Sequence, residues 1–178
     1  MITFRKTLPV FCLLCAAGQA QSAGQVQGQM NVQMTVGSGC TVTNGSSDGS
    51  TNTFGTLNFG EHPSLDNIVE GSSVGAGGGS SFGLQCSSGT NYSVAIDSGL
   101  YSSGTQRRMS NGSAFIAYNL YQDTARTVAW GNGSNGGSVL SGTGSGAAQE
   151  IVVYGRVPVQ ATPAAGTYLD TVQVTVTW

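Results

Sequence analysis

The residues of this chain whose types could do chemistry are few and scattered. His62 is the single histidine, and it stands beside Pro63 in a polar stretch where a solvated side chain is expected. The eight carboxylates form no pair whose spacing favours shared acid–base work. Asp123 and Arg126 lie within a short segment that predicts a turn with a local ion pair of little energetic consequence. We therefore expect no catalytic residues and no enzymatic activity.

A glycine-rich stretch matches a cofactor motif by its letters alone. Residues 131–136 read Gly-Asn-Gly-Ser-Asn-Gly, the pattern of a dinucleotide fingerprint. That fingerprint needs a helix opening on its glycines and an acidic residue about 20 positions further on. More glycine and serine follow here instead. The stretch predicts a loop, and we expect no bound cofactor.

The first 23 residues have the order of a secretory signal peptide. Arg5 and Lys6 precede an apolar run over 8–17, and small residues follow it. The apolar run is about half as long as a membrane-spanning helix requires. We expect cleavage after Ala20 or Ala23 and export of a soluble mature protein.

Two of the four cysteines would leave with that segment, so the Cys-x-x-Cys spacing of Cys12 and Cys15 has no redox or metal meaning. Cys40 and Cys86 remain, and an even pair in an oxidising compartment favours a disulfide. In the chain-entropy model such a long loop closure stabilises the fold by roughly 4 kcal/mol. A zinc site is the alternative, but two cysteines and one distant histidine do not complete four ligands. We expect no metal.

Composition narrows the class of protein. The chain has 178 residues, which is the length of one domain, and only 8% of them are charged, while 28 are glycine. These values exclude a coiled coil and a charge-driven disordered tail. Six basic residues in the whole chain can neutralise few phosphates, so no nucleic-acid partner is expected. Without the signal, four arginines and no lysine stand against eight acids.

The segment after the signal alternates almost perfectly between apolar and polar residues. Over 24–36 glutamine, asparagine and threonine occupy one face, and the other carries Val26, Gly28, Met30, Val32, Met34 and Val36. Such alternation predicts a strand about 36 Å long. Gly37 and Gly39 then break the pattern before Cys40 and would act as a hinge.

The rest of the chain also reads as strands separated by turns. Period-2 patterns predict strands at 53–59, 81–86, 92–96, 115–121, 127–130, 150–159 and 168–178. Turn-rich spacers separate them at 44–45, 48–49, 75–79, 111–112 and 131–146. Many short strands and one disulfide predict an antiparallel β-sandwich. The N-terminal strand could pair within its own chain or fill an open sheet edge of another, and the pattern allows both.

Four segments carry more specific motifs. They are Phe54-Gly-Thr-Leu-Asn-Phe-Gly60 after Gly39-Cys40, Ala117-Tyr-Asn-Leu-Tyr-Gln-Asp-Thr-Ala-Arg126 before Trp130-Gly131, Gly166-Thr-Tyr-Leu-Asp-Thr-Val172 before the C-terminal strand, and Gly28-Gln-Met-Asn-Val-Gln-Met-Thr-Val36. In sequence and order they resemble the spore coat protein U domain family, whose best-known members are the major pilins of archaic (Csu-type) chaperone–usher pili.

The resemblance implies an incomplete immunoglobulin-like β-sandwich of six strands, with a groove where a seventh strand should lie. A periplasmic chaperone would fill the groove temporarily. At the outer-membrane usher, the N-terminal strand of the next identical subunit would replace it. The donor-strand plugs would be Met30, Val32, Met34 and Val36, with Val26 and Gly28 outside the groove. The groove edge and chaperone contact would be Val172, Val174, Val176 and Trp178.

The expected organisation is therefore a signal peptide over 1–23, a donor strand with its hinge over 24–37, and a pilin domain over 38–178. The expected function is that of a structural pilus subunit. It would be exported through the periplasm and polymerise by donor-strand exchange into thin cell-surface fibres for attachment and biofilm formation, without a small-molecule substrate. The alternatives are a non-fibrous secreted or coat-associated domain of the same family, and a tip adhesin. A single domain with a strand to donate disfavours the adhesin.

Overall fold

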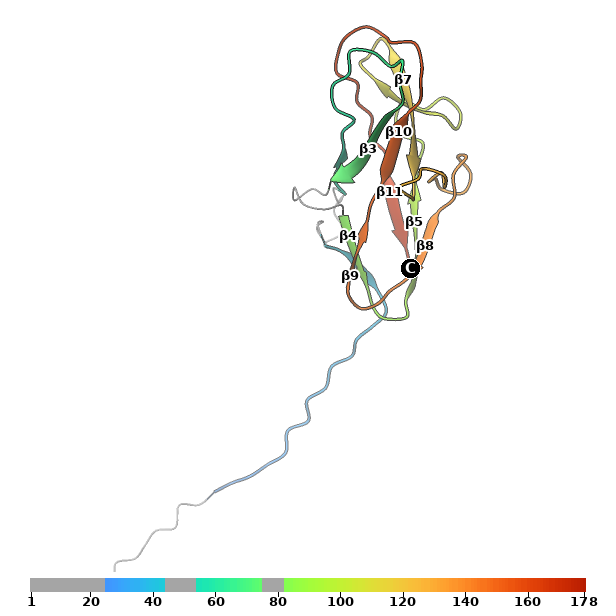
Figure 1. Cartoon of the computed structure of the whole chain (residues 1–178). Coiled ribbons are helices and arrows are strands. Elements are labelled where there is room, and N and C mark those ends of the chain that lie inside the picture. The colour runs from blue at the N-terminus through green and yellow to red at the C-terminus, as the bar shows by residue number, and fades with distance from the viewer. Residues whose placement is uncertain (1–24, 44–53, 75–81) are drawn as a thin grey trace, which may run out of the picture. The chain divides into compact units, whose positions relative to one another are not determined.

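The computed structural model describes residues 25–43, 54–74 and 82–178 (Figure 1). The chain divides into two units, Met1–Thr35 and Val36–Trp178. The signal peptide expected over 1–23 lies outside the described residues, as do the turns expected at 44–45, 48–49 and 75–79.

In the first unit, the described residues 25–35 belong to no strand, and all of their side chains are exposed. The alternation over 24–36 predicts a strand, but the described part of this segment forms no ladder. The physical reason is that a strand satisfies its backbone N–H and C=O groups through a neighbouring strand, and a single amphipathic segment has none. The alternation determines which side chains share a face of an extended segment. Whether that segment forms a β-ladder depends on a neighbouring strand.

The described part of the second unit is built from strands and turns, which confirms the expected all-β fold. Its strands are β1 (Cys40–Val42), β2 (Thr56–Leu57), β3 (Val69–Val74), β4 (Phe82–Cys86), β5 (Asn91–Ile96), β6 (Arg107–Ser110), β7 (Phe115–Tyr121), β8 (Leu140–Thr143), β9 (Ala148–Ile151), β10 (Tyr154–Val157) and β11 (Val174–Thr177). The described residues thus form eleven short strands, where the family resemblance implied six.

Two of the three sheets are joined through consecutive strands, because β3 is followed in the sequence by β4, and β9 by β10. One sheet has the order β2-β3-β10-β7-β6, and another has the order β1-β4-β9. The β3–β10 ladder leads into the β4–β9 ladder, and between them the backbone N–H of Ser73 donates to the carbonyl of Val153 at 2.8 Å. Together they form one layer of the sandwich.

The third sheet, of order β11-β5-β8, supplies the second layer (Figure 1). Alternate side chains of both layers point inward and form one apolar core. The indole of Trp130 is buried in it, and its Nε1–H donates to the carbonyl of Val94 at 2.9 Å. The largest fully buried side chains are Trp130, Phe82, Leu84, Ile96, Val94, Val157 and Cys86.

Strands with regular alternation were the predictable ones. The stretches 81–86, 92–96 and 115–121 agree with β4, β5 and β7 to within one residue at each end, and shorter strands, β2 and β11, lie within 53–59 and 168–178. The expected strand over 150–159 is instead divided, because β9 pairs with β4 while β10 pairs with β3 and β7.

Two expectations about the glycine-rich region are corrected. The stretch 127–130 forms only isolated bridges, from Ala129 to Tyr121 and from Trp130 to Ser138. The stretch 131–146, expected to be a spacer, contains β8. The sequence of β8 is Leu-Ser-Gly-Thr, which has no alternation to recognise. Its conformation depends on its ladder with β5, which is distant in the sequence.

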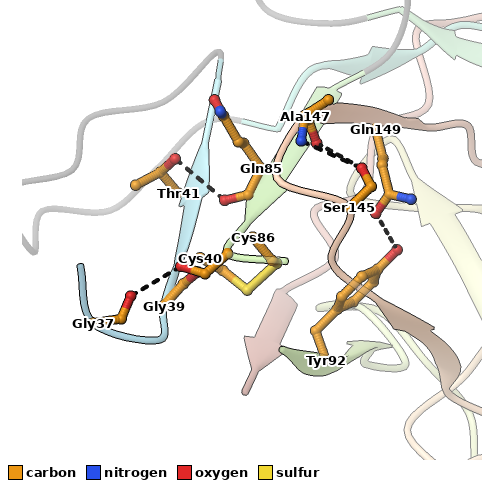
Figure 2. The surroundings of a disulfide bond; sticks show 11 residues. Gly37, Gly39, Cys40, Thr41, Gln85, Cys86, Tyr92, Ser145, Ala147 and Gln149 are labelled. Atoms are coloured by element: carbon orange, nitrogen blue, oxygen red, sulfur yellow. Dashed lines mark hydrogen bonds between the residues drawn. A yellow bond between two sulfur atoms is a disulfide. The ribbon is translucent and has the colours of Figure 1, made fainter. Parts of the chain in front are cut away.

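The expected disulfide joins Cys40 to Cys86 (Figure 2). The two residues are directly opposed in the β1–β4 ladder, and the same ladder pairs Thr41 with Gln85. Just before β1, the carbonyl of Gly37 accepts a hydrogen bond from Ser87 Oγ at 3.0 Å. The chain is therefore tied to β4 from Gly37 onward.

Replacing both cysteines, Cys40→Ala with Cys86→Ala, should lower the free energy of unfolding by roughly 4 kcal/mol, because it releases a closed loop in the unfolded chain. Urea denaturation followed by far-ultraviolet circular dichroism measures this difference. The wild-type protein unfolded in dithiothreitol is the matched control and should behave like the double variant. An unchanged midpoint in both would show that the disulfide is energetically idle.

Candidate functional site

The C-terminal strand lies at the border of its sheet. Within the described residues β11 pairs only with β5, so its other edge has no ladder partner. In the opposite layer β1 and β2 are also edge strands, paired only with β4 and β3 respectively. Unpaired edges expose rows of backbone donors and acceptors that can bind another strand.

A cavity of about 80 Å³ lies between these borders. We name it the β2–β11 cavity. It is lined mainly by apolar side chains from both layers: Phe54, Gly55, Thr56, Leu57, Ser73, Phe82, Leu120, Val153 and Val174. Phe54 meets Phe82 edge to face, with ring centroids 4.8 Å apart. The core is therefore incompletely filled where the two edges approach.

Alternate residues of β11 and of the segment just before it pack against the core, and one of them, Val174, lines the cavity. Val172, Val174 and Val176 are half-buried and pack against the core cluster. Trp178 follows in the same alternation and is 60% exposed. A Cβ placed on Gly39 would lie 4.0 Å from Trp178 Nε1, so the last residue lies beside the start of β1. The role of these four side chains as a groove edge stays a prediction.

A partly exposed polar network holds the segment that leads into β11. The Tyr118 hydroxyl donates to Asp170 Oδ2 at 2.7 Å, and Asp170 Oδ1 accepts from the backbone N–H of Leu100 at 2.9 Å. Asp97 Oδ1 accepts from the backbone N–H of Gln173 at 2.8 Å. Two carboxylates thus attach residues 170–173 to the neighbouring strands.

Burial shifts the pKa values of Tyr118 in this network and of the neighbouring Arg107. Burial raises the pKa of Tyr118 well above its ordinary value, and the hydrogen bond to Asp170 raises it further. The phenol therefore remains a donor at neutral pH. Burial lowers the pKa of Arg107, and its Nε and Nη2 donate to the carbonyls of Asp97 and Ile96 at 2.8 and 3.1 Å.

The four predicted plugs are all exposed. The exposed fractions are 86% for Met30, 89% for Val32, 85% for Met34 and 76% for Val36. Val26, expected to lie outside a groove, is equally exposed at 98%. Exposure thus does not distinguish plugs from their neighbours in the free chain.

The other sequence candidates have ordinary structural partners. His62 Nε2 donates to the carbonyl of Phe59 at 2.7 Å in an exposed loop. The expected pairing of Asp123 with Arg126 is wrong, because Arg126 Nη1 pairs with Glu70 at 3.0 Å. The Asp123 carboxylate instead accepts hydrogen bonds from Val128 and Thr127, and these lower its pKa.

The glycine-rich stretch 131–136 forms a loop, closed by hydrogen bonds from the backbone N–H groups of Ser134 and Asn135 to Asn132 Oδ1. Among the described residues, no three His, Cys, Asp or Glu side chains gather in a way that could hold a metal. In the same residues no helix is long and apolar enough to cross a membrane.

Sequence reasoning did not identify the residues lining the β2–β11 cavity as a set. Phe82 and Leu120 lie in strands that alternation predicted, and Phe54 and Leu57 lie in the motif at 54–60. Their proximity arises from the packing of two layers, which no local pattern encodes. The indications in the sequence were the motifs at 54–60 and 117–126, which contain Leu57 and Leu120, and the expected groove edge, which contains Val174.

The described residues combine an exposed segment of alternating apolar and polar side chains with a β-sandwich whose strand β11 pairs on one side only. The Spore Coat Protein U domain model matches residues 26–175. "Protein U" of Myxococcus xanthus is 33% identical over 166 residues, which cover 88% of this chain and 87% of that protein. The chain belongs to the Spore Coat Protein U domain family, as the sequence motifs predicted.

A solved structure is also similar to this chain. It is the crystal structure of the CsuC–CsuE chaperone–tip adhesion subunit pre-assembly complex from archaic chaperone–usher Csu pili of Acinetobacter baumannii. The sequence identity is 27% and the TM-score is 0.48, over 81% of this chain. The match spans 40% of the other chain's length.

Asp170→Asn should lower the free energy of unfolding by about 1–3 kcal/mol, because the buried Tyr118 hydroxyl loses its charged acceptor. The free energy of local opening measured by amide hydrogen exchange in β11 should fall by a similar amount, since residues 170–173 lead directly into that strand. Tyr168→Phe is the matched control, because its hydroxyl makes an exposed bond to the carbonyl of Ala164. Equal effects of the two substitutions would contradict an anchoring role for Asp170.

Proposed function

We propose that this protein is a structural subunit of a chaperone–usher pilus, and that it polymerises by donating its N-terminal strand to the next identical subunit. The observation that carries the proposal is a pair of incomplete features in one chain. One is the β2–β11 cavity beside unpaired strand edges, and the other is an exposed segment with alternating apolar side chains. Free strand edges and exposed apolar side chains are each unfavourable in water. The edges could bind the backbone of the segment, and the cavity could bury its apolar side chains.

The fit follows from the geometry of a strand. A donated strand would form main-chain hydrogen bonds along the free edge of β11, and every second side chain would face the core. We name the free edges of β2 and β11, together with the β2–β11 cavity, the acceptor groove. Its plugs would be Met30, Val32, Met34 and Val36. Each fully buried plug would contribute roughly 1.5–3 kcal/mol.

The attachment of the chain at Gly37 supports donation to another molecule. The Gly37 carbonyl is bound by Ser87 Oγ, and Cys40 is bound by the disulfide. Residues beyond Gly37 toward the N-terminus form no described ladder. In this proposal the donor strand and hinge span 24–37, and the pilin domain spans 38–178.

The same physics requires partners before assembly. A subunit with an open groove exposes apolar surface, so a periplasmic chaperone would occupy the groove and contact the edge at Val172, Val174, Val176 and Trp178. An outer-membrane usher would then be the place of exchange. The signal peptide over 1–23 would deliver the chain to the periplasm, and the fibre would act outside the cell in attachment and biofilm formation.

A non-fibrous, coat-associated domain is a second candidate. It is favoured by the 33% identity to Protein U, which extends over nearly the full length of both chains. In that case the N-terminal segment would complete the fold of its own chain or of a single partner. The two candidates differ in the size of the assembly.

Deletion of residues 24–36 distinguishes the pilus subunit from the non-fibrous candidate. Wild-type protein, coexpressed with its chaperone and exported, should give a ladder of multimers on a gel in sodium dodecyl sulfate without boiling. The ladder should collapse on boiling and be absent in the deletion, because the groove would have no donor. A wild-type monomer band alone would favour the non-fibrous candidate. A ladder that persists in the deletion would mean that another segment is donated.

Met34→Asp should abolish multimers while leaving the chaperone complex intact, because a charge on the donor face cannot enter an apolar groove. We expect the multimer fraction to fall at least about tenfold. Gln33→Asp places the same charge on the opposite face and is the matched control. Normal fibres from Met34→Asp would show that the donor face is misassigned, and the yield of copurified chaperone reports whether the domain itself is intact.

A further inference from the structure

The methionines of this chain are unevenly distributed. Downstream of the expected signal peptide there are three, Met30, Met34 and Met109. Met30 and Met34 are exposed and alternate with valines, whereas Met109 is half-buried in β6 and packs against the core. Two of the three thioethers are therefore open to solvent in the segment proposed to be donated.

Exposed thioethers have a specific reactivity. Hydrogen peroxide transfers one oxygen atom to the methionine sulfur: a new S–O bond forms, the O–O bond breaks, and water leaves. The sulfur is oxidised by two electrons and the peroxide is reduced. The product, methionine sulfoxide, is polar, and methionine sulfoxide reductases return it to the thioether at the expense of a thiol reductant.

Few other groups compete for the oxidant. Cys40 and Cys86 are both consumed in the disulfide, so the described residues present no free thiol. The sulfur atoms of Met30 and Met34 are then the most accessible soft nucleophiles in the described part of the chain.

The acceptor side is unsuited to the oxidised product. Apart from Gly55, Thr56 and Ser73, the β2–β11 cavity is lined by phenylalanine, leucine and valine side chains. A sulfoxide oxygen placed there would lose its water and gain few donors. A flexible, unbranched thioether, in contrast, adapts well to an irregular apolar space.

We propose that Met30 and Met34 are oxidation sites that control assembly: their sulfoxides prevent strand donation, and burial in the groove protects them once the fibre has formed. This inference rests on the proposed function. Val32 and Val36, the other two plugs, cannot be oxidised in this way, so the control resides in alternate plug positions. Oxidants in the surroundings would act on unassembled subunits and spare finished fibres.

The test compares oxidation before and after assembly. Full-length subunit held by its chaperone is treated with dilute hydrogen peroxide, and peptide mass spectrometry measures the gain of one oxygen at each methionine. We expect rapid oxidation of Met30 and Met34, slow oxidation of Met109, and a multimer fraction reduced at least about tenfold. Fibres assembled first and treated in the same way should keep their multimers and their unoxidised donor methionines.

Matched variants identify the responsible sulfur atoms. Met30→Leu with Met34→Leu keeps two large apolar plugs, so it should assemble and be insensitive to peroxide. Met109→Leu should assemble and remain as sensitive as wild type. Treatment of oxidised wild type with methionine sulfoxide reductases A and B and a thiol reductant should restore both the original mass and the multimers.

Each failure has a distinct meaning. If untreated wild type forms no multimers, the proposed function is wrong and this inference falls with it. If untreated and fully oxidised subunits form equal multimers, only the oxidation control is overturned. If the double leucine variant does not assemble, the reductase experiment decides, and recovery of mass without recovery of multimers overturns the proposal.

Discussion

Within the described residues β11 has a ladder partner on one side only, and this is the constraint on which the rest of the structure depends. A sheet border that ends beside a cavity leaves backbone groups without partners and core side chains without full contact. The fold therefore has to hold β11 in place from one side only. It does so through the ladder with β5, and through two carboxylates near the start of the strand. Asp97 accepts from the backbone N–H of Gln173, and Asp170 accepts from the backbone N–H of Leu100 and from the Tyr118 hydroxyl.

The opposite border is held by covalent chemistry. The β1 strand is short and pairs only with β4 among the described residues, so its hydrogen bonds alone would leave it prone to fray. The disulfide places Cys40 against Cys86, whose side chain belongs to the buried core. Within the described residues, β11 and β1 are thus each held in place by one neighbouring strand and by further bonds, from the Asp97 carboxylate for β11 and from the disulfide for β1.

Much of this arrangement could be predicted from the sequence, for identifiable reasons. Regular alternation in β4, β5 and β7 predicted their positions, and the two cysteines that follow the expected signal peptide predicted the disulfide. β3 reads Val-Glu-Gly-Ser-Ser-Val, and its central glycine and serines interrupt the alternation of apolar and polar residues. The sequence therefore did not predict this strand, which pairs with β10.

Long-range contacts were the less predictable part. Arg126 forms its ion pair with Glu70, which is distant in the sequence, and not with the nearby Asp123. The residues lining the β2–β11 cavity come from segments more than a hundred positions apart in the chain, and no local pattern records their meeting. The family motifs at 54–60 and 166–172 indicated that these regions matter without indicating what they enclose.

The placement of the disulfide has a mechanical consequence. Tension applied to the N-terminal segment enters the domain at Gly37 and Cys40. Without the covalent bond, that pull would peel β1 from β4 one hydrogen bond at a time. With it, the load passes directly through sulfur into β4, an interior strand flanked by β1 and β9. There the load is shared by the hydrogen bonds of both ladders that flank β4.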